Sequence, residues 1–169
     1  ARAFIVHRDS VTGVEHLFAL HDYLGVVSGC YDPNSNNPGH VVWNRTREKL
    51  DLSLVGDYKK LAVRPLALAS TGGNLYLSSG AWILRRVDGP KPVWKVVVNV
   101  TSARSGDGEL KEAVGGIRGM TAVPSPSGTG TSLMFCWTPN GESRAGILRA
   151  DFNEQGDLTG PLHEEGSIS

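Results

Sequence analysis

The sequence predicts an all-β fold in which one four-stranded antiparallel sheet is repeated three times. Two observations carry this prediction. The 21 glycines and 9 prolines separate short apolar runs and interrupt the chain too often for long helices. Three segments also repeat the same order of strands and turns, and similarity at a regular spacing is a strong indicator of repeat architecture.

Each repeat contains four short predicted strands, joined by turns rich in Gly, Pro, Asn and Asp. The three repeats span 2–44, 64–99 and 118–164, and the last strand of the third is the weakest match. Their predicted strands are, in order, Arg2–His7, Glu15–Leu20, Gly25–Asp32 and His40–Asn44; Arg64–Ser70, Asn74–Ser78, Trp82–Asp88 and Val93–Asn99; Arg118–Pro124, Ser132–Trp137, Ala145–Asp151 and Leu158–His163.

Differences in length between the repeats fall in two predicted connections, 45–63 and 100–117. Within them, Leu50–Leu61 and Gly108–Val114 are rich in Glu, Lys, Leu and Ala, so one or two helical turns are an alternative there. A β-sandwich is the alternative for the whole chain, because twelve short strands also pair as two sheets. The same strand order, met three times, favours the repeat.

The repeat resembles the β-propeller superfamily, six-bladed type, over nearly the whole chain, and matches no single family within it. The corner from Val87 to Trp94 is similar to the Asp-box turn of sialidase-like propellers, but Arg86 replaces the usual Ser or Thr and the spacing to Trp94 is one residue longer. Three blades leave two apolar sheet faces open. The resemblance therefore implies that a second copy or a homologous chain completes a ring of six blades; a fragment of a longer precursor is the alternative.

Composition limits the classes of partner. Seventeen basic and seventeen acidic residues give a net charge of zero, which provides no chain-wide attraction to nucleic acid. No apolar stretch approaches the roughly eighteen residues that cross a bilayer. We expect neither nucleic acid nor membrane as a partner, and the opening Ala-Arg-Ala without a charged-then-apolar leader is typical of a processed product.

Two sequons and two cysteines bear on localisation. Asn44 and Asn99 begin Asn-x-Thr sequons at the end of the fourth strand of their repeats, which favours a secreted, extracellular glycoprotein. Asn and Thr also simply suit a strand terminus. Cys30 and Cys136 lie in different repeats, too far apart for the roughly 4.4–6.8 Å Cα separation of a disulfide, so we expect buried free thiols.

Candidate ligand-binding residues follow from repeat positions. Arg2, Arg64 and Arg118 each begin the innermost strand of a blade, where a ring of guanidinium groups would attract an anionic ligand at the channel mouth; clamping of neighbouring blades is the alternative. His7 ends an innermost strand and is expected to face the channel. Trp82 and Trp137, beside turns, are candidates for stacking on a sugar ring, and blade packing is their alternative role.

Calcium is the cofactor that the sequence suggests. Asp151, Asn153 and Asp157 place oxygen-bearing side chains at alternate positions, but Leu162 stands where a calcium loop has its bidentate acid. A hairpin turn uses the same residues and is the favoured interpretation.

No catalytic motif is present, since no Ser, His and Asp set lies on a recognised turn such as Gly-x-Ser-x-Gly. We therefore expect a non-enzymatic, secreted, oligomeric binding protein that holds a small molecule or a glycan, as a lectin does. The alternative is a propeller enzyme, a hydrolase, lyase or oxidoreductase at the central channel, with His7 and carboxylates such as Asp9 or Glu15 as acid and base. A structural interaction module is a third possibility.

Overall fold

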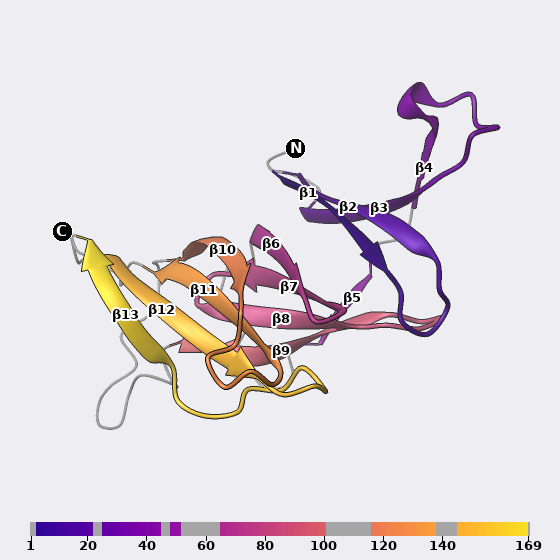
Figure 1. Ribbon diagram of the computed structural model, residues 1–169. Helices are drawn as coiled ribbons and strands as arrows, with labels where there is room; N and C mark the ends of the chain where they lie inside the picture. Colours follow the sequence, from indigo (N-terminus) through magenta and orange to yellow (C-terminus); the bar gives the residue numbers. More distant parts are fainter. Residues whose placement is uncertain are drawn as a thin grey trace.

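The computed structural model describes residues 3–21, 25–44, 48–51, 65–100, 116–137 and 145–168. Their strands form three separate sheets that follow one another in chain order, shown from indigo through magenta to yellow in Figure 1. The predicted all-β class and the three four-stranded antiparallel sheets are confirmed. Three sheets rather than two exclude the sandwich.

The first and third sheets are antiparallel throughout, with strands paired in sequence order. A short 3-10 turn, Pro38–His40, precedes the last strand of the first sheet. The strands of the first sheet are β1 (Ala3–Arg8), β2 (Glu15–His21), β3 (Gly25–Tyr31) and β4 (Val41–Trp43); those of the third are β10 (Ile117–Val123), β11 (Thr131–Trp137), β12 (Ala145–Phe152) and β13 (His163–Ile168).

The middle sheet has a fifth strand that the sequence did not indicate. Its antiparallel part consists of β6 (Pro65–Thr71), β7 (Asn74–Ser79), β8 (Trp82–Val87) and β9 (Val93–Asn99), and β5 (Lys49–Asp51) pairs with β9 in parallel. This strand lies inside the predicted connection 45–63, so Leu50 and Asp51 are not helical. The other helical alternative, Gly108–Val114, falls outside the described residues.

The three sheets fan out from their first strands, because β6 contacts both β1 and β10 (Figure 1). Two apolar clusters fill the spaces between sheets. Phe18 of the first sheet packs with Leu75, Leu77 and Trp94 of the middle sheet. Tyr76 and Ile83 on the opposite face of the middle sheet pack with the third sheet.

How many faces of a sheet are buried depends on whether the sheet lies in the middle or at an end of the row of three. Because side chains alternate between the two faces of a strand, Leu75 and Leu77 face the first sheet while Tyr76 faces the third. All three are fully buried, and burial raises the pKa of Tyr76 to about 12. The middle sheet is thus covered on both faces, whereas β1 buries alternate residues only.

A close backbone approach closes the β10–β11 turn onto the end of β12. Gly130 has a φ of +73°, and a Cβ atom there would lie 2.2 Å from the carbonyl oxygen of Phe152. Gly128, in the same turn, has nearly the same φ, +72°, but nothing lies within 4 Å of such an atom.

We predict that Gly130→Ala lowers the free energy of unfolding by clearly more than Gly128→Ala. Both substitutions introduce the left-handed strain of about 1–2 kcal/mol, but only the first also forces the backbone of Phe152 aside. Urea denaturation of the two variants measures the difference. Equal losses would show that the approach to Phe152 is not a constraint.

Candidate functional site: a charged cleft between the first and middle sheets

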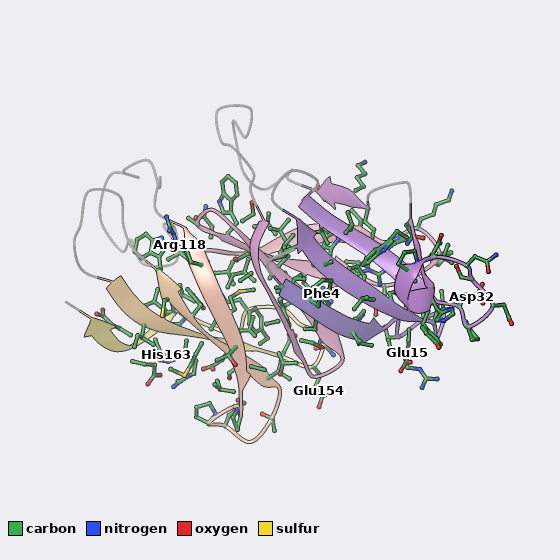
Figure 2. All side chains as sticks on the ribbon, turned by 90° about the horizontal axis from the view of Figure 1, so that it is seen from above. Phe4, Glu15, Asp32, Arg118, Glu154 and His163 are labelled. Atoms are coloured by element: carbon green, nitrogen blue, oxygen red, sulfur yellow. The ribbon has the colours of Figure 1, made fainter. Side chains whose placement is uncertain are left out.

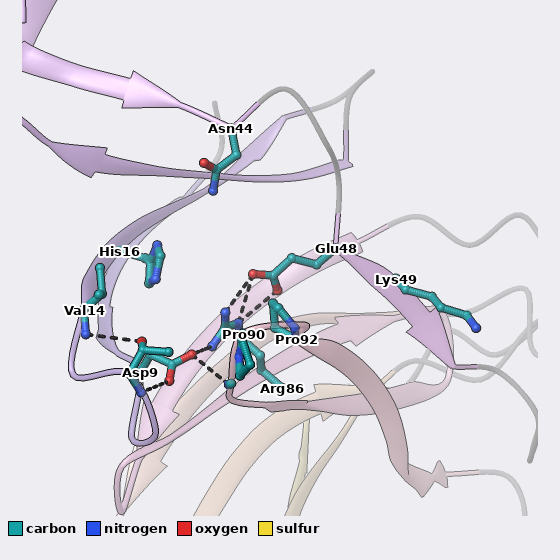
Figure 3. A pocket seen from close by; sticks show the side chains of 11 residues that line it. Asp9, Val14, His16, Asn44, Glu48, Lys49, Arg86, Pro90 and Pro92 are labelled. Atoms are coloured by element: carbon teal, nitrogen blue, oxygen red, sulfur yellow. Dashed lines mark hydrogen bonds and ion pairs between the residues drawn. The ribbon is translucent and has the colours of Figure 1, made fainter.

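Arg86 on β8 is the centre of a buried ionic network. Its guanidinium contacts carboxylates from three separate segments: Asp9 in the β1–β2 turn, Glu48 just before β5, and Asp88 just after β8 (Figure 3). Nη1 lies 2.8 Å from Oδ2 of Asp9 and also contacts Oδ1 of Asp88. Nε and Nη2 each lie 2.9 Å from a Glu48 oxygen, which makes that pair bidentate.

Backbone groups hold Asp9 in this network. Its Oδ1 accepts hydrogen bonds from the N–H groups of Val11 and Thr12, and its Oδ2 accepts one from Gly89 across the sheet boundary. Burial by itself raises the pKa of Asp9, but the hydrogen bonds from Arg86 and from these backbone N–H groups outweigh burial and hold the pKa far below its usual value. Asp9 is therefore an ionised structural group.

His7 extends the network to Asp88. Nε2 of His7 lies 3.0 Å from both carboxylate oxygens of Asp88, and because a carboxylate only accepts, Nε2 carries the proton. The N–H of Ser10 donates to the same carboxylate at 2.8 Å. Although burial favours the neutral acid, these hydrogen bonds lower the pKa of Asp88 below its usual value.

The guanidinium of Arg86 also lies over the ring of Phe18, with 5.3 Å between Cζ and the ring centroid. Burial disfavours its charge, yet the hydrogen bonds to Glu48 and Asp9 raise the pKa of Arg86 above its ordinary value. The first and middle sheets are therefore joined by ionic and apolar contacts at one place.

An open cleft of about 550 Å³ lies over this network. Its polar wall includes His16 and Asn44 of the first sheet, and Figure 3 shows the side chain of Lys49 pointing away from Arg86. We call this space the charged cleft; its lining residues are Asp9, Thr12, Val14, His16, Asn44, Glu48, Lys49, Arg86, Gly89, Pro90 and Pro92.

Two side-chain contacts on the first sheet hold Asn44 and His16 in place in the wall of the charged cleft. Nδ2 of Asn44 donates to Oγ of Ser28 at 2.7 Å, and Nδ1 of His16 lies 3.3 Å from Sγ of Cys30. Asn44 and Ser28 belong to neighbouring strands, as do His16 and Cys30. The sheet therefore presents an amide, an imidazole and a thiol in fixed relative positions.

The acid–base residues expected at the channel are placed differently. His7 is buried and bonded to Asp88, because the β8–β9 turn packs over the end of β1. Asp9 is paired with Arg86, and Glu15 is exposed. The structure does not bring these three side chains together as an acid and base around an open site.

The two tryptophans considered for sugar stacking lie in the apolar clusters. Trp82 packs between the first and middle sheets and Trp137 between the middle and third sheets, and both are buried. Neither presents an open ring face to a ligand, in agreement with the packing alternative. Among the three arginines, Arg118 lies on β10 and is exposed, whereas Arg2 and Arg64 fall outside the described residues.

The residues considered for calcium form a hairpin turn. Oδ1 of Asn153 accepts the N–H of Asp157 at 2.9 Å, and Oδ1 of Asp151 accepts hydrogen bonds from Ser132 and Arg149. These contacts use the oxygens that a cation would need. Across the described ranges, no three His, Cys, Asp or Glu side chains are grouped as metal ligands.

The sequons and cysteines occupy distinct places. Asn44 follows β4 and is exposed, and Asn99 ends β9 and is half-buried. Cys30 and Cys136 are free thiols, as expected, but the expectation that both are buried is wrong: Cys136 is exposed and Cys30 is half-buried. Each lies on a sheet with only one face packed against the rest of the described chain, so β11 presents Cys136 on its open side.

Sequence reasoning missed the centre of this site. Arg86 was noted only as a departure from the Asp-box pattern, and Glu48 lay in a predicted connection. The Arg86-Val87-Asp88 spacing was a usable signal, because residues two apart on a strand share a face and these two carry opposite charges. Nothing local marks Asp9 or Glu48 as their partners.

Comparisons with known proteins add no identification: no protein-family model, curated protein or solved structure matches this chain. Among the residues that the structure describes, no helix is long and apolar enough to cross a membrane. The inference of a function therefore rests on the geometry of the charged cleft.

We predict that Arg86→Met costs about 3–5 kcal/mol of stability, because it leaves buried carboxylates without their cation. In the wild type, the lowered pKa values of Asp9 and Asp88 give stability that is complete above the ordinary value of 3.8 and is lost as pH falls below it. In the variant Asp9 loses the hydrogen bond from Arg86 but keeps those from backbone N–H groups, so its pKa lies closer to the ordinary 3.8 and stability falls less steeply between about pH 5 and about pH 3 than in the wild type.

Thermal unfolding across this pH range measures the effect. Arg85→Met is the matched control, since Arg85 is the neighbouring arginine and its ion pair, 3.6 Å from the exposed Asp157, is a weak one. If Arg86→Met and Arg85→Met had the same loss and the same pH profile, the network would have no special role.

Proposed function

We propose that this chain forms three blades of a six-bladed β-propeller that binds a small, hydroxyl-rich ligand in the charged cleft. The observation that carries the proposal is the cleft of about 550 Å³, whose polar wall stands on a buried network in which Arg86 is bonded to three carboxylates. Such a floor supplies hydrogen-bonding groups whose positions are set before the ligand arrives.

The fan of three sheets supports the propeller. Each sheet is a meander of four antiparallel strands, and β6 contacts the first strands of both neighbouring sheets, as innermost strands around a common axis do. The first and third sheets each use one face in this packing. Completion of the ring by a second chain is part of the proposal.

The lining of the cleft favours a neutral sugar-like ligand. The lining residues include two acidic groups, Asp9 and Glu48, and the guanidinium of Arg86 is already bonded to carboxylates, so no free guanidinium is available to select an anion. His16 provides hydrogen-bonding groups that match hydroxyls. Two prolines and a valine supply the apolar part of the wall that the carbon face of a sugar needs; these are Val14, Pro90 and Pro92.

Anion binding at the channel mouth is a second candidate. Arg118 favours it, because this residue is exposed on β10, the first strand of the third sheet. A planar guanidinium there suits a carboxylate or sulfate. The same position would be equivalent to Arg2 and Arg64 in the repeat.

We favour binding over catalysis, because His7 and Asp9, the acid–base pair of the enzymatic alternative, are engaged with Asp88 and Arg86. The sequons at Asn44 and Asn99 support a secreted glycoprotein as the setting. Asn44 both carries a sequon and lines the cleft, so a glycan there would stand at its mouth.

We predict that neutral mono- and oligosaccharides bind the protein, and that His16→Ala weakens this binding about tenfold through the loss of one hydrogen-bonding group. Isothermal titration calorimetry measures the affinity. His163→Ala, an exposed histidine on the third sheet, is the matched control and leaves binding unchanged.

Acidic sugars separate the two candidates. If an acidic sugar binds more tightly than its neutral counterpart, and Arg118→Ala but not His16→Ala abolishes that binding, the channel mouth is the site and the cleft is not. Failure of all sugars to bind would reject the proposed ligand class.

A further inference from the structure

The first sheet has an apolar outer face with no partner in the described chain. On the side away from the middle sheet, Phe4 is 60% exposed, Val6 61%, Tyr31 68% and Trp43 41%. Every large apolar side chain that is exposed among the described residues lies in this sheet or its turns: Phe4, Val6, Val11, Val14, Tyr31, Val42 and Trp43. Apolar surface concentrated in this way marks an interface.

A row of paired residues crosses the outer face of the first sheet. Val6, Leu17, Gly29 and Trp43 are paired in register and form one row across all four strands. The ring of Trp43 lies over Gly29, because a Cβ atom on that glycine would be 3.0 Å from the ring. A continuous apolar row of this kind suits packing against another sheet.

The outer face of the third sheet differs from that of the first, because no large apolar side chain is exposed on its described residues, and only one of the two open apolar faces expected from the sequence is present. Gly119, Cys136, Ile147 and Gly166 form the corresponding row across β10 to β13. Their neighbours Phe135 and Leu148 face the middle sheet, so this row faces outward. Two of its four residues are glycines, which leaves room for the side chains of a facing sheet.

A charged contact within the chain shows how one sheet meets the next. Arg85 of the middle sheet faces the third sheet, where its Nη2 lies 3.6 Å from Oδ1 of Asp157 in the β12–β13 turn. Gly156 of the same turn lies against this side chain, since a Cβ atom there would be 2.5 Å from Cδ of Arg85. An arginine of one sheet thus contacts the acidic turn of the following sheet.

Arg149 holds the same position in the third sheet that Arg85 holds in the middle sheet. Both follow an Ile-Leu pair, Ile83-Leu84 or Ile147-Leu148, and a register shift falls within that pair in both sheets. Within the described chain, Arg149 pairs with its own sheet, through Asp151 and Glu165. Among the described residues, no acidic turn of another sheet contacts it.

In the first sheet the turn between β3 and β4 corresponds to the β12–β13 turn, and it begins with Asp32, whose own counterpart in the repeat is Asp151. Asp32 is half-buried, and its Oδ1 accepts the N–H of Asn34. Asp32 and His163, the latter on the third sheet, lie toward opposite ends of the molecule in Figure 2. Contact between Arg149 and Asp32 therefore requires two molecules.

We propose that the outer face of the third sheet of one chain packs against the outer face of the first sheet of a second copy, with Arg149 meeting the Asp32 turn of that copy. This inference rests on the proposed propeller and names its partner. A twofold axis makes the contact twice, so each copy uses both of its open faces and the ring closes. The charges of Arg149 and Asp32 are complementary.

Native mass spectrometry and sedimentation of the full chain test the proposal. The expected mass is twice the 18.1 kDa of one chain. Val6→Lys places a charge in the centre of the interface and weakens dimerisation roughly 100-fold. Val11→Lys, a valine of similar exposure (66%) in the β1–β2 turn, leaves the dimer intact. A monomeric wild type, or equal effects of the two variants, would overturn the proposal.

A charge exchange establishes which faces meet. Arg149→Glu and Asp32→Arg each weaken dimerisation roughly tenfold, because each brings like charges together, and the double variant restores it. Circular dichroism verifies that all variants remain folded. A dimer that pairs two first sheets would lose stability with Val6→Lys but be insensitive to the charge exchange, and this result would refute the proposed arrangement.

The ligand test and the interface test fail independently. The charged cleft lies between two sheets of one chain, so sugar binding by the monomeric Val6→Lys variant is expected to match that of the wild type. Sugar binding without dimerisation leaves the proposed ligand class standing and rejects the interface. Dimerisation without sugar binding supports the interface and rejects the proposed ligand class.

Discussion

The ionic network around Arg86 is the constraint on which the join between the first and middle sheets depends. A buried guanidinium is stable only if acceptors satisfy it, and here these come from three segments distant in sequence: Asp9, Glu48 and Asp88. Their arrangement fixes the β1–β2 turn, the start of β5 and the β8–β9 turn relative to one another. The walls of the charged cleft are the same three segments together with His16 and Asn44, so stability and site geometry have one origin.

Apolar packing complements this network and orders the sheets. The middle sheet lies between two apolar clusters, one on each face, while the flanking sheets each contribute one face. The same four-stranded unit therefore meets different surroundings depending on its position in the chain. On the third sheet the outer face retains Arg149 and its acidic neighbours, and on the first it retains Phe4, Val6 and Trp43. The two ends of this row of sheets therefore present surfaces of different chemical character.

The fold was predictable because its signal is local and repeated. Turn residues such as Thr71-Gly72-Gly73 and short apolar runs such as Leu75-Tyr76-Leu77 of β7 mark each strand separately, so a small error at one strand does not alter the whole prediction. The site was harder to predict from the sequence. His7, Trp82 and Trp137 were assigned roles from their repeat positions, yet burial in each case was decided by the neighbouring sheet. The short strand β5 escaped notice because three residues paired in parallel carry no recognisable pattern.

The sequence by itself determined the all-β class and the three-fold repetition of a four-stranded sheet, since both follow from periodicity. Only the tertiary structure decided that Arg86 gathers three carboxylates, that Glu48 precedes a fifth strand, and that the apolar surface of the first sheet lies open. The physical reason is that ionic pairing and burial depend on which segments meet in space, and residues separated by as many as 77 positions, as Asp9 and Arg86 are, leave no local trace of their contact.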